Sequence, residues 1–198
     1  SLTRAPRAAW WVVVPDASAH AVGARFALRY VPVYAAEESL TVAGRALPPG
    51  AWLVEMSRVD RALMDSLARV RGLVVLAAPA SAVERIARHE MDLPRIALLH
   101  SWRNTQDEGW ARFTLEQMGV PYTYIGEDKL RGGAKLAGRF DVVLFPSQGA
   151  NSDAKEILQG VDPKFSPLPY TRTAEFPTHG FPDSTSDMTG GMGYEGLA

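Results

Sequence analysis

The sequence contains no cysteine, which excludes disulfide bonds, thiolate nucleophiles and cysteine-ligated zinc. It also lacks any block of like charges, and its formal net charge is −1. A nucleic-acid-binding protein usually carries a basic surface, so this balance argues against such a role. No apolar run approaches the roughly 18 residues that suggest a membrane span. These absences favour a globular chain that neither binds nucleic acid nor crosses a membrane.

The chain does contain enough apolar residues for a sizeable core, since 46% of its 198 residues are hydrophobic. We predict two α/β units, covering residues 1–93 and 94–198. In the first unit, short apolar runs predict strands at residues 10–14, 31–35, 40–42, 46–55 and 73–77. Helical spacing of apolar residues predicts helices over residues 17–30 and after Ser57.

The second unit begins at Pro94 and repeats the strand–helix alternation. Strands are predicted at residues 95–100, 122–125 and 141–145, and a helix over residues 107–118. This alternation favours a mostly parallel sheet with helices on both faces, preceded by the smaller α/β unit. From Gln159 to Gly193 the sequence is rich in proline and has little periodicity. Such a stretch is typical of a lid, a docking segment or disorder.

No motif for catalysis or metal binding is complete. A zinc carboxypeptidase site needs His-x-x-Glu, and none of the four histidines begins that pattern. The letters at 191–196 match G-x-G-x-x-G, but a proline-rich loop precedes them where a strand is required, so we predict a loop leading into a helix. Ser147 follows a strand as a nucleophile would, yet Phe145 replaces the first glycine of G-x-S-x-G. We therefore assign no catalytic residue and no metal ligand.

Four residues remain as candidates for binding a small ligand: His100, Trp102, Ser147 and Gln148. All follow predicted strands, and ligands of open α/β sheets bind at the carboxyl ends of strands.

The helix after Trp102 has a simpler interpretation. Thr105 and Glu108 fit a capping box, in which both side chains satisfy the free amides at a helix start. Trp110 and Phe113 are expected to pack into the core.

The stretch from Pro94 to Tyr122 resembles the C-terminal region of large bacterial zinc carboxypeptidases of the carboxypeptidase A type. Its matching motifs are Ser101-Trp102, Asp107-Glu108-Gly109-Trp110, Leu115-Glu116-Gln117 and Pro121-Tyr122, followed by Arg139–Val143 and Gly190–Gly193. The resemblance implies a class I glutamine amidotransferase-like, flavodoxin-type fold, truncated at its C-terminal end. Amidotransferases of this type use a cysteine at a later strand–helix elbow, and this chain has none.

The resemblance implies that the chain is a non-catalytic accessory domain of a secreted zinc metallocarboxypeptidase. The partners would be the catalytic domain of the same polypeptide and its peptide substrate. Zinc would belong to that domain, with no cofactor in this chain, and the location would be periplasmic or extracellular. Two alternatives stay open: a free-standing amidase or hydrolase that uses Ser147, and a small-ligand or glycan-binding module.

Overall fold

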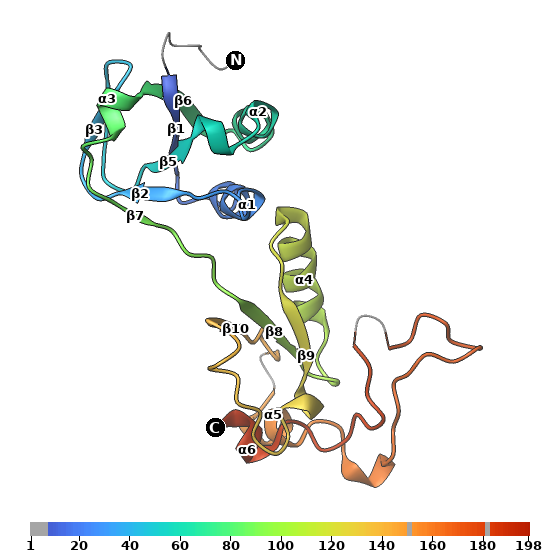
Figure 1. Ribbon diagram of the computed structural model, residues 1–198. Helices are drawn as coiled ribbons and strands as arrows, with labels where there is room; N and C mark the ends of the chain where they lie inside the picture. Colours follow the sequence, from blue (N-terminus) through green and yellow to red (C-terminus); the bar gives the residue numbers. More distant parts are fainter. Residues whose placement is uncertain (1–7, 150–151, 181–182) are drawn as a thin grey trace. The chain divides into compact units, whose positions relative to one another are not determined.

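The computed structural model describes residues 8–149, 152–180 and 183–198 (Figure 1). The chain divides into two compact units, each with its own sheet. One comprises residues 1–93 and 118–120, and the other comprises residues 94–117 and 121–198. The first unit contains β1 (Ala8–Val14), α1 (Ala19–Ala27), β2 (Tyr34–Ala36), β3 (Leu40–Val42), β4 (Arg45–Leu47), β5 (Trp52–Glu55), η1 (Met56–Arg58), α2 (Arg61–Val70), β6 (Val74–Pro79), α3 (Ala80–Val83) and β7 (Arg88–Glu90).

The main sheet of the first unit has the order β6-β1-β5-β2-β7, and its pairings are antiparallel. The expectation of a mostly parallel, flavodoxin-type sheet is therefore wrong. Strand–helix–strand alternation leads to a parallel sheet only where the two strands that the helix connects belong side by side in the same sheet. Here β1 is followed by α1 and β2, yet β1 pairs with β5 and β6 instead. An apolar run specifies burial of a strand but not its direction.

Strand β1 is buried on both faces, which explains its unbroken apolar sequence. Because side chains alternate along a strand, Trp11 and Val13 face one core, and Trp10 and Val12 face another. The first core is completed by α1 and α2, and the second by the β3–β4 hairpin and α3. In Figure 1 the two helices and the hairpin lie on opposite sides of the sheet.

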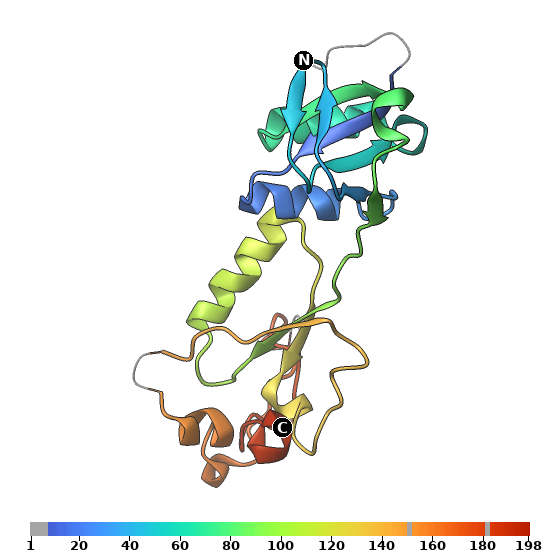
Figure 2. The same ribbon diagram turned by 90° about the vertical axis from the view of Figure 1, so that its left-hand side faces the viewer.

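The second unit contains β8 (Ile96–His100), α4 (Gln106–Met118), β9 (Thr123–Gly126), η2 (Glu127–Lys129), β10 (Val142–Leu144), α5 (Ala154–Gln159), η3 (Pro163–Phe165) and α6 (Gly193–Leu197). Its sheet is parallel, with the order β10-β8-β9, so parallel pairing is confined to three strands. Alternate residues of β8, Ala97 and Leu99, enter a core that includes residues of α5 and Met192. Helix α5 lies beside α6 (Figure 2).

Helix α4 turns a polar face inward. Glu108 is buried, whereas Trp110 is 64% exposed and Phe113 is 53% exposed, so the expectation that these two aromatics pack into the core is wrong. Positions 108 and 112 share one face, while position 110 lies about 200° away from 108 around the helix. The sheet is contacted through Arg112, whose guanidinium lies 4.8 Å from the ring centre of Tyr124 on β9.

The proline-rich segment is held by a few specific bonds. Tyr170 and Thr185 exchange two backbone hydrogen bonds of 2.9 and 3.2 Å. The Asp187 carboxylate accepts from the amides of Leu168 and Thr189 and from the Ser166 hydroxyl. These bonds join residues 166–170 to residues 185–188.

The longest helix within the described ranges is α4, with 13 residues. A membrane-spanning helix needs about 20 apolar residues. None of the helices in those ranges therefore meets the length and apolarity of a membrane span.

Candidate ligand pocket

His100 ends β8 and is almost fully buried, at 2% exposure. Its Nε2 lies 3.2 Å from Oδ2 of Asp183. The imidazole stacks on Tyr124, with ring centres 4.3 Å apart, and meets the edge of Trp102 at 4.4 Å. Tyr124 belongs to this group because parallel pairing places it opposite Leu98, on the same face of the sheet as His100.

Asp183 is surrounded by donors. Its Oδ2 also accepts the Gly126 amide at 2.9 Å, and its Oδ1 accepts the Ser184 amide at 2.8 Å. Burial by itself raises the pKa of a carboxyl group, but the hydrogen bonds from His100 and the two amides outweigh burial and lower the pKa of Asp183. Asp183 is therefore ionised, and both of its carboxylate oxygens accept hydrogen bonds.

Trp102 is fixed at both its backbone and its side chain. Its amide donates to Oε1 of Glu127 at 3.2 Å, and its indole Nε1 donates to Oδ1 of Asp128 at 2.8 Å. The ring of Tyr170, from the proline-rich segment, lies 5.4 Å away. These contacts hold an aromatic wall that continues from β9 through His100 and Trp102 to Tyr170.

A pocket of about 510 Å³ lies against this wall. Its size falls within the range of roughly 300–1,000 Å³ that is typical of small-molecule sites. It lies beyond the carboxyl ends of β8 and β9, between their aromatic face and α4. The lining residues are His100, Trp102, Thr105, Glu108, Gly109, Arg112, Tyr124, Tyr170, Asp183 and Met188. We call this the aromatic pocket.

Glu108 is the unusual member of the aromatic pocket. It is 3% exposed, and within the described residues its Oε1 accepts no hydrogen bond. Arg112 lies 3.8 Å from that oxygen, beyond hydrogen-bond distance, and also pairs with Glu116 at 3.7 Å. Burial raises the pKa of Tyr124, and so do a hydrogen bond to the Glu108 carboxylate and the negative charge of that carboxylate, so this phenol is neutral at physiological pH. A buried carboxylate oxygen without a donor costs stability.

Ser147 and Gln148 do not join His100 and Trp102. They line a separate pocket of about 320 Å³, and only Thr105 lines both pockets. The Ser147 hydroxyl accepts the Gly149 amide at 3.2 Å, and the Gln148 side-chain amide donates to the Pro146 carbonyl at 3.0 Å. The four sequence-predicted residues are thus split into two pairs.

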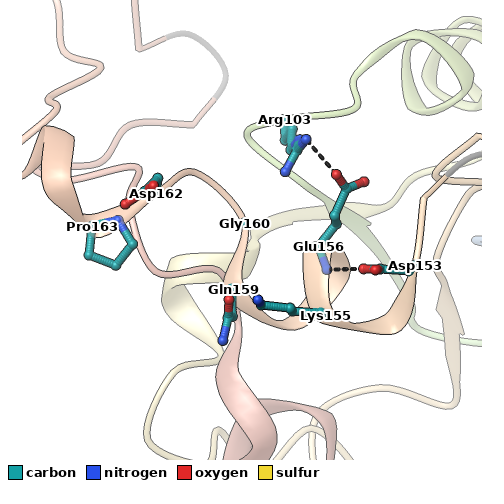
Figure 3. A pocket seen from close by; sticks show the side chains of 8 residues that line it. All are labelled: Arg103, Asp153, Lys155, Glu156, Gln159, Gly160, Asp162 and Pro163. Carbon is teal, nitrogen blue, oxygen red and sulfur yellow. Dashed lines mark hydrogen bonds and ion pairs between the residues drawn. The ribbon is translucent and has the colours of Figure 1, made fainter.

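A third pocket, of about 440 Å³, is formed around α5 (Figure 3). Arg103 and Glu156 pair across it at 2.6 Å, and Asp153 caps α5 by accepting the Glu156 amide at 2.7 Å. Asp162, another of its charged groups, pairs with Lys164, which is not among the described lining residues. This pocket has no aromatic residue among its lining residues, so it offers less for a ligand than the aromatic pocket.

Eight lining residues of the aromatic pocket were not predicted as site residues, and they include Glu108, Tyr124, Tyr170 and Asp183. Glu108 has the sequence signature of a helix cap, which conceals its place in the pocket. Parallel pairing of β8 with β9 would have indicated Tyr124. Tyr170 and Asp183 have no local signal, because they reach the pocket from a segment without periodicity.

Comparison with known proteins found no matching family model, no matching curated protein and no matching solved structure. In the described part of the chain, no group of three or more histidine or acidic residues is arranged to hold a metal ion.

Proposed function

We propose that this chain is a non-catalytic accessory region of a secreted zinc carboxypeptidase, and that its aromatic pocket holds a small ligand. The observation that carries the proposal is that the pocket has binding groups but no activated nucleophile. His100 Nε2 faces Asp183, and no hydroxyl in the described residues is hydrogen-bonded to this imidazole. Nucleophilic catalysis needs the base within about 3.2 Å of the attacking hydroxyl.

Ser147 is the nucleophile that a hydrolase of this chain would need. It lines the other pocket, is exposed, and its hydroxyl accepts a backbone amide. No histidine is among the described residues that line that pocket. Binding is therefore favoured over hydrolysis.

The link to a carboxypeptidase is supported by the sequence resemblance. The same stretch that carries this resemblance also builds the pocket, since it supplies Trp102, Glu108 and Gly109. It further supplies Trp110 and Phe113, whose rings meet edge to face at 6.1 Å on the outside of α4. Exposed aromatic pairs of this kind are enriched at protein interfaces. We propose that this pair contacts the catalytic domain, which would hold the zinc ion outside the cell or in the periplasm.

Two measurements test the proposal. The purified chain is incubated with ester, amide and C-terminal peptide reporters, and we expect no turnover in the wild type or in Ser147→Ala. Turnover that depends on Ser147 would contradict the proposal. Unfolding of the chain is then followed with and without the separately purified catalytic domain. We expect a higher melting temperature with the domain, because a partner that binds only the folded state stabilises it.

The control for docking is a variant with both Trp110→Ser and Phe113→Ser. We expect it to fold normally and to lose the shift caused by the catalytic domain. If the wild-type chain shows no shift at concentrations of partner that saturate ordinary interfaces, the accessory role is wrong.

A further inference from the structure

We infer that the aromatic pocket binds a neutral, hydroxyl-rich ring of the pyranose type. This inference rests on the proposed function, since it names the ligand class of the same pocket. It begins with Glu108, whose buried Oε1 accepts no hydrogen bond within the described residues. A hydroxyl of the ligand supplies the missing donor, in a charge-assisted bond that is stronger than one between neutral groups.

The charges around the pocket select a neutral donor over a cation. Arg112 lies 3.8 Å from the free oxygen of Glu108 and already offsets its charge. Asp183 receives three donors, from His100, Gly126 and Ser184. Neither carboxylate therefore needs a cation. A lysine or arginine side chain would in addition be repelled by Arg112, whereas a hydroxyl oxygen can accept from it.

The aromatic wall suits the apolar face of a sugar ring. Both faces of Tyr124 are occupied, by His100 and by the Arg112 guanidinium. Trp102 and Tyr170 lie 5.4 Å apart at a tilt of 54°, and the ring of Tyr170 also stacks on His179 with ring centres 5.1 Å apart. Trp102 is prevented from turning by its bond to Asp128. A rigid aromatic surface next to hydrogen-bonding groups is a common design for small-molecule sites.

The experiment uses the full chain labelled with ¹⁵N, titrated with the methyl pyranosides of glucose, galactose, mannose and N-acetylglucosamine. Cellotriose and chitotriose are added to distinguish a free ring from the end of a glycan. The indole N–H signal of Trp102, assigned by Trp102→Phe, reports binding in this pocket. We expect at least one of these sugars to shift that signal in a saturable manner.

Glu108→Gln tests the contact that carries the inference. It keeps the size of the side chain and removes its charge, and we expect the dissociation constant to rise about tenfold or more. The matched control is Glu116→Gln, because Glu116 is on the same helix and also pairs with Arg112 but does not line the pocket. We expect the control to bind as the wild type does. A second variant, Tyr170→Ala, weakens binding from the opposite wall without altering α4.

Three results would overturn the inference. The first is that no sugar shifts the Trp102 signal at about 50 mM, at which a ligand with a dissociation constant of about 5 mM would occupy roughly nine-tenths of the sites. The second is that Glu108→Gln and Glu116→Gln weaken binding equally. The third is that acetyl-lysine methylamide binds more tightly than every sugar. None of these results would bear on the accessory role, because turnover and docking to the catalytic domain are measured without sugar.

Discussion

His100 and Asp183 are 83 positions apart in the sequence, and their side chains approach to 3.2 Å. This contact joins the end of a buried strand to the proline-rich segment. It also connects two walls of the aromatic pocket, since both residues line it. The pocket is therefore a product of the tertiary fold, and its stability can be tested at this contact.

Asp183→Ala is expected to lower the free energy of unfolding by about 2 kcal/mol at pH 7, because three donors lose a buried acceptor. The pKa of Asp183 is lower in the folded state than its ordinary value of 3.8. Its stabilisation is thus complete above that value and is lost as the pH falls through the folded-state pKa. Urea unfolding at pH 7 and pH 3 measures the effect. A difference between wild type and variant that grows towards acid would contradict this assignment.

Glu127→Gln is expected to stabilise the protein by about 1 kcal/mol at pH 7. Glu127 is fully buried, and burial raises its pKa above the ordinary value of 4.5 in spite of the bond from the Trp102 amide. A raised carboxyl pKa means that the wild type loses stability as the pH rises through the folded-state value. The gain from glutamine should therefore disappear near pH 4. Thermal unfolding across this range is the measurement, with the exposed Glu116→Gln as a control that stays within about 0.5 kcal/mol of the wild type.

Gly160→Ala is expected to cost at least about 2 kcal/mol. Gly160 has a φ of 55°, and a Cβ there would lie 2.7 Å from Cα of Gly191 and 2.8 Å from Oε1 of Glu127. Gly132→Ala is the matched control, because Gly132 also has a positive φ of 87° but no atom within 4 Å of the added carbon. The control should cost only about 1 kcal/mol, for the backbone conformation. Equal costs in chemical denaturation would show that the close approach to Gly191 is unimportant.

Trp110→Ser should change the free energy of unfolding by less than about 1.5 kcal/mol, since the side chain is 64% exposed and its ring contact is with Phe113. Trp11→Ala provides the contrast. Trp11 is 5% exposed in the core of the first unit, and its loss should cost about 3–5 kcal/mol. Chemical denaturation of both variants tests whether Trp110 lies on the exposed face of α4. If both variants lost a similar amount of unfolding free energy, Trp110 would be buried.

The sequence predicts elements well where a single residue pattern determines them. The strand at residues 95–100 and the helix at residues 107–118 are confirmed as β8 and α4 to within one residue at each end. The prediction of a mostly parallel sheet was wrong, because the main sheet depends on pairing of β1 with β5 and β6, which lie far along the chain. The prediction of which side chains α4 turns towards the core was also wrong. Apolar periodicity places aromatics in the core, whereas this helix buries Glu108 beside Tyr124 and Arg112.

For the site, His100 and Trp102 could be found because they follow an obvious strand. Ser147 and Gln148 follow another strand by the same logic, yet they line a different pocket. The rule that ligands bind at strand ends predicts the edge of the sheet where a site lies. It does not predict which loops come together at that edge. Tyr170 and Asp183 come from a segment whose position is determined by single bonds, and such bonds leave no pattern in the sequence.

The contacts between residues 166–170 and residues 185–188 make ligand affinity depend on local folding. Tyr170 and Asp183 line the pocket while these contacts are intact. The Asp187 carboxylate accepts two of them, from Ser166 and Leu168, and Asp187 is not among the described lining residues. The apparent dissociation constant equals the intrinsic one divided by the fraction of molecules in which the contacts are intact. A substitution at Asp187 would thus weaken ligand binding from outside the pocket, and a bound ligand would in turn stabilise these contacts.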